Sequence, residues 1–306
     1  MPEAGEFRPV FIMGHHRSGT TILYKVLAET GLFNVVTAYH VLYHERLLAL
    51  HAAGGELQAR NELSRRFEGL GLKDREFDSM RITPDIPEEY AWVLDHQGRR
   101  PRLRPANLEG FLRFCRALTT TQDPARPLLL KNPFDAANFL YMGAALPEAR
   151  FVYIHRDPVE VVNSQVRAVR SLLSSRNEYV ALVVRRYRRL YERPLKLAVA
   201  RFLYSDRFPL LVTQVAHNVS RTNDHFLRGG GDLGDRCFNL TYDGLCSAPG
   251  RTTSRMLDFL GMRDLAAGRD YGALVKRRDT GLLPEVETRR GRIRARNSAY
   301  CSAFGV

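Results

Sequence analysis

The chain lacks any long apolar run. No stretch of its 306 residues approaches the roughly 20 consecutive apolar residues that a transmembrane helix needs. The segment Met1–Arg8 is short and polar, and the run Val10–Met13 that follows is too brief for the hydrophobic region of a signal peptide. We therefore expect a cytoplasmic protein rather than a membrane-spanning or secreted one.

Cysteine is also scarce. The four cysteines form no Cys-x-x-Cys pair, and their spacing fits neither a zinc site nor a dense disulfide framework. We expect reduced, mostly buried thiols and no metal site. The four are Cys115, Cys237, Cys246 and Cys301.

Acidic residues are few relative to basic ones. Lys and Arg number 46 against 33 Asp and Glu, which gives a net charge of +13 and favours a polyanionic partner such as nucleic acid, anionic lipid or a phosphorylated ligand. Basic residues concentrate in 185–201, which reads as a solvated helix face or a peripheral membrane contact. They concentrate again in 276–296, a Gly- and Arg-rich stretch that we interpret as a loop closing over a phosphate.

Short apolar runs alternate with helical patterns along most of the chain. This alternation predicts an α/β fold: a P-loop-like parallel β-sheet flanked by helices on both faces, with an additional helical region. We expect one domain over 1–306, with helical insertions at about 43–125 and 171–230 and a basic C-terminal tail, 263–306. The predicted strands are 8–13, 32–37, 127–130, 150–155 and 236–241, and the longer predicted helices are 44–75, 107–120, 134–146, 177–227 and 251–260.

A glycine-bounded turn follows the first predicted strand. Residues Gly14–Thr21 read Gly-His-His-Arg-Ser-Gly-Thr-Thr, the frame of a Walker A nucleotide loop with Thr20 in the place of its lysine. A turn of this kind directs backbone N–H groups and a helix N-terminus at an anion, and Arg17 supplies a cation from inside the loop. Arg156, rather than a magnesium-binding acid, follows the strand 150–155, which disfavours a magnesium-dependent nucleotide kinase. A phosphosulfate, which carries less charge, fits better.

A second anion site is predicted after the strand 150–155. The strand delivers Arg156 to its end, and Asp157-Pro158 opens a helix as its N-cap and first residue. Ser164 lies about two turns into that helix, close to the face of Arg156. A guanidinium and a hydroxyl in this arrangement suit a terminal phosphate dianion.

These two motifs resemble those of the sulfotransferase superfamily. The string Arg17-Ser18-Gly19-Thr20-Thr21 looks like the family's 5′-phosphosulfate loop, closest to the version in protein-tyrosine sulfotransferases and their bacterial relatives, and the segment from Arg156 to Ser164 resembles its 3′-phosphate signature. The resemblance implies 3′-phosphoadenosine 5′-phosphosulfate (PAPS) as sulfuryl donor, with no metal. It implies in-line transfer to a hydroxyl or amine. It covers about 10–48, 80–95, 127–170 and 236–262.

The resemblance also implies further site residues. Lys131, in Leu-Lys-Asn-Pro-Phe, would act with Arg17 on the transferring group, and Tyr242, after the last predicted strand, would lie at the donor site. The general base is implied near the end of the second strand, where His40 replaces the glutamate of the tyrosine sulfotransferases. His44, Glu45 and Glu89 are open alternatives for this base.

The acceptor is not named by any motif. We expect a small molecule or glycan, held by residues 78–97 and by the helices of 177–227, and the oligomeric state is not predicted. A nucleotide kinase is the alternative enzyme. A basic nucleic-acid-binding protein is the alternative from another class, but no recognition motif supports it, so we expect no nucleic-acid partner.

Overall fold

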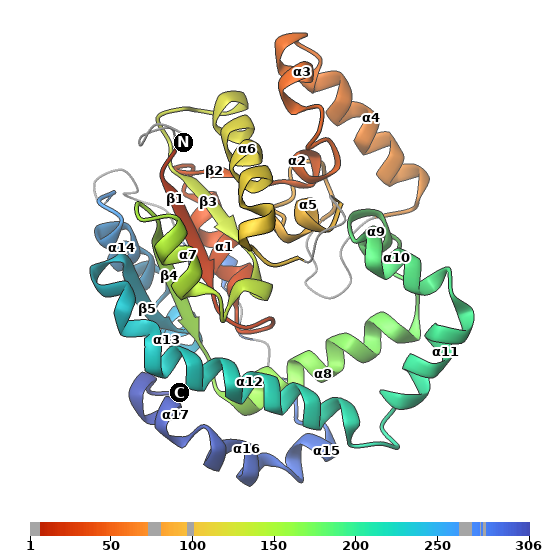
Figure 1. Ribbon diagram of the computed structural model, residues 1–306, viewed down its shortest axis with the longest axis vertical. Helices are drawn as coiled ribbons and strands as arrows, with labels where there is room; N and C mark the ends of the chain where they lie inside the picture. The colour runs from red at the N-terminus through yellow and green to blue at the C-terminus, as the bar shows by residue number, and fades with distance from the viewer. Residues whose placement is uncertain (1–6, 73–80, 97–100, 263–270, 276, 278–279) are drawn as a thin grey trace.

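The computed structural model describes residues 7–72, 81–96, 101–262, 271–275, 277 and 280–306. Within these residues, five parallel strands form one sheet in the order β2-β3-β1-β4-β5 (Figure 1). Among the described helices, none is both long and apolar enough to cross a membrane. The strands are β1 Pro9–Met13, β2 Asn34–Val35, β3 Leu128–Lys131, β4 Arg150–His155 and β5 Cys237–Thr241.

Strand β1 lies at the centre of the sheet and is buried on both faces. It pairs in parallel with β3 on one side and with β4 on the other. Phe11 and Met13 belong to the larger apolar cluster, whereas Val10 and Ile12 point into a second cluster on the opposite face. This alternation is the reason the strand reads as a continuous apolar run, as strands buried on both faces do.

Helices cover both faces of the sheet, which confirms the predicted fold class. Helix α1 packs on one face with α13 and α14, while α6 and α7 pack on the other (Figure 1). The helices up to β4 are α1 Thr20–Glu29, α2 Ala38–Leu42, α3 Leu47–Ala52, α4 Glu56–Gly69, α5 Ala91–His96, α6 Pro105–Thr121, the 3₁₀ helix η1 Pro133–Asp135 and α7 Phe139–Ala145.

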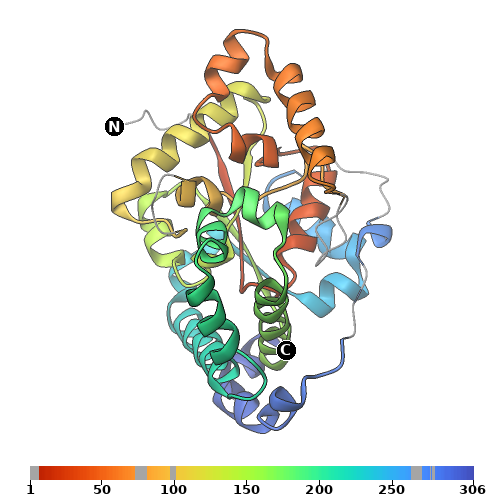
Figure 2. The same ribbon diagram turned by 90° about the vertical axis from the view of Figure 1, so that its right-hand side faces the viewer.

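The rest of the chain adds a predominantly helical region beside the sheet. Helices α8 to α12 run from β4 outward and back toward β5, and the last three helices pack against α8 and α12 (Figures 1 and 2). These elements are α8 Pro158–Ser174, α9 Glu178–Val183, α10 Arg185–Tyr191, α11 Pro194–Leu203, α12 Leu210–Gly229, η2 Gly230–Arg236, α13 Tyr242–Ser247, α14 Pro249–Phe259, η4 Gly272–Leu274, α15 Pro284–Glu287, α16 Arg290–Arg296 and α17 Ser298–Phe304.

Several helix boundaries differ from the prediction. The helix predicted over 44–75 is two helices, α3 and α4, because the chain turns between them at Gly54, whose φ of 64° is left-handed. The end of the predicted strand 32–37 passes instead into the short helix α2. The basic tail forms α15, α16 and α17 over 284–304, whereas the sequence predicts a loop over 276–296. Residues 263–270, 276 and 278–279 of that tail lie outside the described residues.

Candidate active site

The loop between β1 and α1 is held in an unusual backbone conformation. Gly14, Arg17 and Gly19 all have positive φ, and Arg17, at 68°, is the one non-glycine residue of the described chain that does. A non-glycine residue in this region carries strain and points to a functional constraint. Ser18 closes the turn, because both its N–H and its hydroxyl donate to the carbonyl of His15, at 3.2 and 2.8 Å.

Helix α1 begins directly after this loop without a side-chain cap from the described residues. Its first N–H groups therefore retain their capacity to bind an anion, and the positive end of the helix dipole adds to that preference. Glycine is required at position 19 for two reasons. Its φ is 102°, and a Cβ there would lie 2.5 Å from Cδ2 of Tyr242.

The structure brings the two predicted anion sites together. Nε of Arg17 donates to Oγ of Ser164 at 3.1 Å, although 147 positions separate the two residues. The guanidinium of Arg156 donates to the carbonyl of Arg17 at 3.0 Å and stacks over the ring of Tyr242, with Cζ 4.1 Å from the ring centroid. The loop, the start of α8 and the start of α13 thus form one basic cluster at the carboxyl ends of the strands.

Hydrogen bonds within the protein use only some of the N–H donors of Arg156. Its Nε and one terminal nitrogen donate to Glu160, at 2.9 and 2.8 Å, and its other terminal nitrogen donates to Arg17. A guanidinium has five N–H donors, so these three bonds leave capacity for a ligand. Asp157 caps α8 as predicted, because its side chain accepts from the N–H groups of Val159 and Glu160.

Lys131 reaches the start of α1 from the end of β3. Its Nζ donates to Oγ1 of Thr21 at 3.0 Å and forms an ion pair with Glu89 at 2.9 Å. The Lys131 side chain is 3% exposed and that of Glu89 is 12% exposed, so the pair is largely shielded from water. The two charges compensate each other at a place where an isolated ammonium would be costly.

Glu89 arrives at this position through long-range backbone pairing. Thr37, after β2, forms an antiparallel bridge with Pro87, and the N–H of Glu88 donates to the carbonyl of Val36 at 2.9 Å. Glu88 is held in turn by Trp92 Nε1 at 3.1 Å and by the hydroxyl of Tyr179 at 2.5 Å. The segment 87–89 is therefore anchored by strands and helices from three parts of the chain.

His40, the predicted general base, takes part in the cap of helix α2. Its Nδ1 accepts the N–H of Thr37 at 3.1 Å and so completes the capping box of α2. The side chain is buried, and this burial, reinforced by the charge of Arg60, lowers the pKa of His40 to about 3. The structure thus places Glu89, rather than His40, in contact with Lys131; the role of His40 as base stays a prediction.

His16, which the sequence indicated only as a loop residue, lies beside the Lys131–Glu89 pair. Its ring packs edge-on against Phe134 at 4.4 Å between centroids, and its Nε2 is shielded from solvent with no hydrogen-bond partner among the described residues. Burial above all lowers the pKa of His16 to about 4; the charge of Glu89 opposes this effect and that of Lys131 adds to it. The ring is therefore neutral at pH 7.

Helices of the basic tail contact the residues that hold the β1–α1 loop and the start of α8. His15 Nε2 hydrogen-bonds to Asn223 on α12 at 2.7 Å, and Asn223 donates to Asn297 at 2.9 Å. Arg294 on α16 pairs with Asp157 at 2.9 Å. The tail thus supports the loop through ordered helices.

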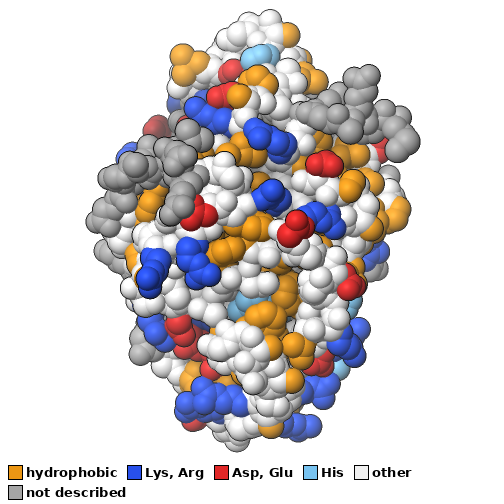
Figure 3. All heavy atoms as spheres, turned by 90° about the vertical axis from the view of Figure 1, so that its left-hand side faces the viewer, with side chains coloured by type: hydrophobic (Ala, Val, Ile, Leu, Met, Phe, Trp, Pro, Cys, Tyr) orange, Lys and Arg blue, Asp and Glu red, His pale blue; other side chains and the backbone are white. Residues whose placement is uncertain are grey.

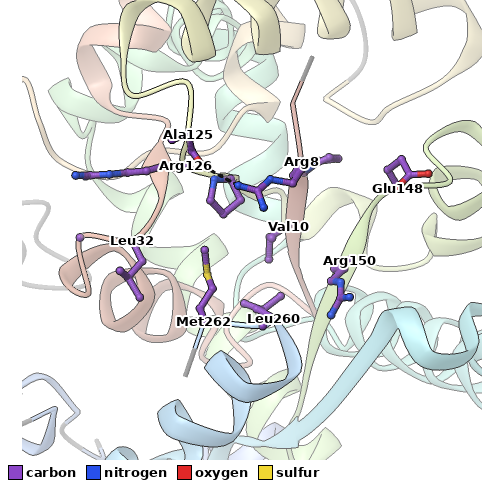
Figure 4. Close-up of a pocket in the computed structure, with 13 residues that line it drawn as sticks. Arg8, Val10, Leu32, Ala125, Arg126, Glu148, Arg150, Leu260 and Met262 are labelled. Carbon is purple, nitrogen blue, oxygen red and sulfur yellow. Dashed lines mark hydrogen bonds between the residues drawn. The ribbon is translucent and has the colours of Figure 1, made fainter. Parts of the chain in front are cut away.

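A surface pocket lies at the other end of the sheet, away from this cluster. Figure 4 shows it at the amino ends of β1 and β4, lined by Arg8, Arg150 and Leu260 among others. Arg8 is hydrogen-bonded to the carbonyl of Ala125 at 2.7 Å, and Arg150 stacks over Phe259 with Cζ 5.3 Å from the ring centroid. Ligands of open parallel sheets bind at the carboxyl ends of the strands, so we assign the site to the Arg17 cluster.

Residues 9–208 match the model of the sulfotransferase family. The chain belongs to the sulfotransferase family. The matched range includes the Arg17 loop, Lys131, Arg156 and Ser164, whereas Tyr242 lies beyond it.

Two curated relatives match part of the chain. The omega-hydroxy-beta-dihydromenaquinone-9 sulfotransferase Stf3 of Mycobacterium bovis, and that of Mycobacterium tuberculosis, is 25% identical over 179 residues. The match covers 54% of this chain and 46% of the relative, so the chain spans about half the length of these curated relatives.

The crystal structure of sulfotransferase STF9 from Mycobacterium avium is 14% identical, with a TM-score of 0.64, over 99% of this chain and 78% of that one. Sulfotransferase STF1 from Mycobacterium tuberculosis is 15% identical, with a TM-score of 0.54, over 97% of this chain and 77% of that one. At these identities the likeness shows the shared sulfotransferase fold.

Proposed function

We propose that this chain transfers a sulfuryl group from PAPS to a hydroxyl or amine of a small acceptor, without a metal ion. The observation that carries the proposal is the 3.1 Å hydrogen bond between Arg17 and Ser164, which joins the two anion sites into one cluster. A single adenosine bisphosphate has a phosphorylated group at each of two positions of one ribose, and two adjacent anion sites suit it. Membership of the sulfotransferase family supports the same conclusion.

The donor's two ends would be held by different parts of the cluster. The backbone N–H groups of 19–21, with the hydroxyls of Thr20 and Thr21, would bind the 5′-phosphosulfate at the start of α1, while Ser18 closes the turn through His15. Arg156 and Ser164 would bind the 3′-phosphate, and Tyr242 would fix the plane of the Arg156 guanidinium against which it stacks. Arg17 bridges the two ends, because its backbone shapes the loop and its side chain contacts Ser164.

Lys131 and Glu89 are placed for the chemical step. The Lys131 ammonium, bonded to Thr21 at the start of α1, would stabilise the charge that develops on the leaving phosphate oxygen. Glu89 would accept the proton of the acceptor hydroxyl as the new oxygen–sulfur bond forms and the bond to the leaving oxygen breaks. We therefore propose Glu89 as general base in preference to His40, whose Nδ1 serves the cap of α2.

An aromatic wall next to this pair supports an acceptor with an apolar body. Phe134 is 38% exposed and contacts both His16 and Trp92, with ring centroids 4.4 and 5.7 Å apart. The Stf3 relatives are named for a hydroxylated menaquinone, an apolar molecule that ends in a hydroxyl. We propose a hydroxylated small molecule as acceptor in preference to a glycan. Residues 78–80 and 97 of the predicted pocket lie outside the described residues. Cytoplasmic location and the absence of nucleic-acid binding stay predictions.

Transfer of labelled sulfate tests this proposal. The purified chain would be incubated in EDTA with ³⁵S-labelled PAPS and a library of hydroxylated small molecules and glycans. We expect a labelled product with the wild type and none above background with Lys131→Ala. The matched control is Lys25→Ala, which removes a lysine from α1 and should retain the product. The absence of product in every mixture, or equal product with Lys131→Ala, would contradict the proposal.

A further inference from the structure

An apolar surface patch covers α11 and its connection to α12. We call it the α11 patch. Its most exposed members are Leu195 at 83%, Val199 at 57% and Phe202 at 55%. Large apolar side chains that are this exposed and contiguous mark interaction sites on soluble proteins. The full set is Leu195, Val199, Phe202, Leu203, Phe208 and Leu210.

The patch results from the orientation of α11. Leu197, on the inner face of the helix, is buried, and Arg201 Nε donates to the carbonyl of Leu173 on α8 at 2.6 Å. Leu195, Val199 and Phe202 follow one another at spacings of four and three residues, so they share the opposite face. Phe202 also contacts Phe208, with ring centroids 4.9 Å apart, which extends the patch beyond the helix.

This face forms an outer edge of the molecule. Helix α11 lies at the edge in Figure 1, outside α8 and α12, and its side of the molecule faces the viewer in Figure 2. The opposite side, shown in Figure 3, carries basic, acidic and hydrophobic side chains interspersed with one another.

Basic residues flank the patch in the sequence. Residues 185–207 contain eight Lys and Arg against two acids, Glu192 and Asp206. All eight basic residues are exposed: Arg185, Arg186, Arg188, Arg189, Arg193, Lys196, Arg201 and Arg207. An apolar helix face bordered by Lys and Arg is the pattern of helices that lie in a bilayer interface, with apolar side chains among the lipid tails and cations at the headgroups.

We propose that the α11 patch docks this protein on an anionic lipid bilayer. The excess of positive charge in 185–207 matches a negatively charged leaflet, and the apolar ridge matches its hydrocarbon. A second copy of the chain is a poorer occupant. A twofold contact would set one basic border against another, in a protein whose net charge is already +13.

Docking through α11 also affects how an acceptor would reach the site, an inference that rests on the proposed function. The helices that carry the patch belong to the insertion that reaches the site, because the hydroxyl of Tyr179 on α9 donates to Glu88, the neighbour of Glu89, at 2.5 Å. Helix α11 contacts α10, which contacts α9, so a bilayer under α11 would lie beside the helices that contact the segment of Glu88 and Glu89. An apolar acceptor dissolved in the bilayer would then approach Glu89 and Lys131 from that side.

Vesicle flotation with the full chain tests the docking itself, without donor or acceptor. The vesicles would be phosphatidylcholine alone, or phosphatidylcholine mixed with phosphatidylglycerol. We expect binding to the mixed vesicles that weakens in high salt, and little binding to phosphatidylcholine alone. The double variant Leu195→Asp/Phe202→Asp should weaken binding tenfold or more, and Lys196→Gln about fivefold.

Two matched controls isolate the patch. Leu57→Asp changes a leucine of α4 that is 71% exposed, and Arg251→Gln removes an exposed cation from α14; each should leave binding within about twofold of the wild type. Circular dichroism melts show whether each variant folds. If the double variant does not fold, binding by the surface variant Lys196→Gln still tests the proposal. Failure of the wild type to bind mixed vesicles would overturn the proposal. So would equal binding by Lys196→Gln and by wild type, or a dimer in ultracentrifugation that Leu195→Asp dissolves.

Discussion

Replacement of Ser164 by alanine tests whether this residue binds the 3′-phosphate, independently of the 5′-phosphate site. Its hydroxyl lies 3.1 Å from Arg17 Nε and is proposed to donate to the 3′-phosphate. A hydrogen bond to a charged group contributes about 1.5–3 kcal/mol. Ser164→Ala should therefore weaken the binding of adenosine 3′,5′-bisphosphate by about 10- to 150-fold.

Adenosine 5′-monophosphate, which lacks the 3′-phosphate, should respond differently. Ser164 would not contact this nucleotide, so the substitution acts on it only indirectly, through the orientation of the charged Arg17 guanidinium. We expect an indirect effect of about 1 kcal/mol or less, so the affinity should fall by no more than about fivefold. Isothermal titration calorimetry of both nucleotides measures the two effects. Ser171→Ala, at an exposed position on the same helix, is the control and should change neither affinity. Equal losses for the two nucleotides would show that Ser164 does not contact the 3′-phosphate.

Three other predictions follow from the same contacts. Glu89→Gln should lower kcat by about 10²- to 10⁴-fold, as expected for the loss of a general base, whereas His40→Gln, which preserves the capping box, should lower kcat less than about threefold. Steady-state kinetics on an identified acceptor measure both values, and a slower His40→Gln enzyme would assign the base to His40 instead. Gly19→Ala should weaken nucleotide binding at least tenfold in calorimetry, because its Cβ would lie 2.5 Å from Tyr242 at a positive φ; unchanged affinity would show that the loop tolerates a side chain there. The pKa is lowered to about 4 for His16 and to about 3 for His40, so the unfolded chain takes up protons before the folded chain as pH falls below about 6.5. The urea concentration at the unfolding midpoint should therefore decrease as pH falls from 6.5 to 4. A constant midpoint would contradict the burial of these rings.

The donor side of the site was predictable because its signals are local. A buried strand, a glycine-bounded turn and a helix start lie within Pro9–Glu29, and the N-cap and proline that open α8 are adjacent in sequence. Parallel strands then bring such loops to one edge of the sheet whatever their order. This general rule is sufficient to predict that the Arg17 loop and Arg156 meet.

The acceptor side depends on pairing that no local pattern records. Glu89 reaches Lys131 because Pro87 bridges to Thr37 across 50 positions, and the short helix α2 then directs His40 into a cap. The distance in sequence from a strand end therefore could not predict that Glu89, rather than His40, contacts Lys131. The buried, unpartnered ring nitrogen of His16 is likewise a property of packing against Phe134.

The ordered tail escaped prediction for a related reason. Helices α15, α16 and α17 have at most seven residues each. Each contains one buried residue: Val286, Ile293 and Tyr300, respectively. Such short elements show no apolar periodicity, and isolated helices of this length are unstable in water. Their order comes from contacts with α8 and α12, which only the folded chain provides.

Calorimetric titration of adenosine 3′,5′-bisphosphate into the wild-type chain, in EDTA, tests the central claim most directly. We predict one site per chain with a dissociation constant in the micromolar range or tighter, and a loss of at least tenfold in the Arg156→Ala variant. Binding of ATP with magnesium but not of the bisphosphate, or bisphosphate binding that is unaffected by Arg156→Ala, would contradict the assignment of Arg17 and Arg156 to two ends of one nucleotide.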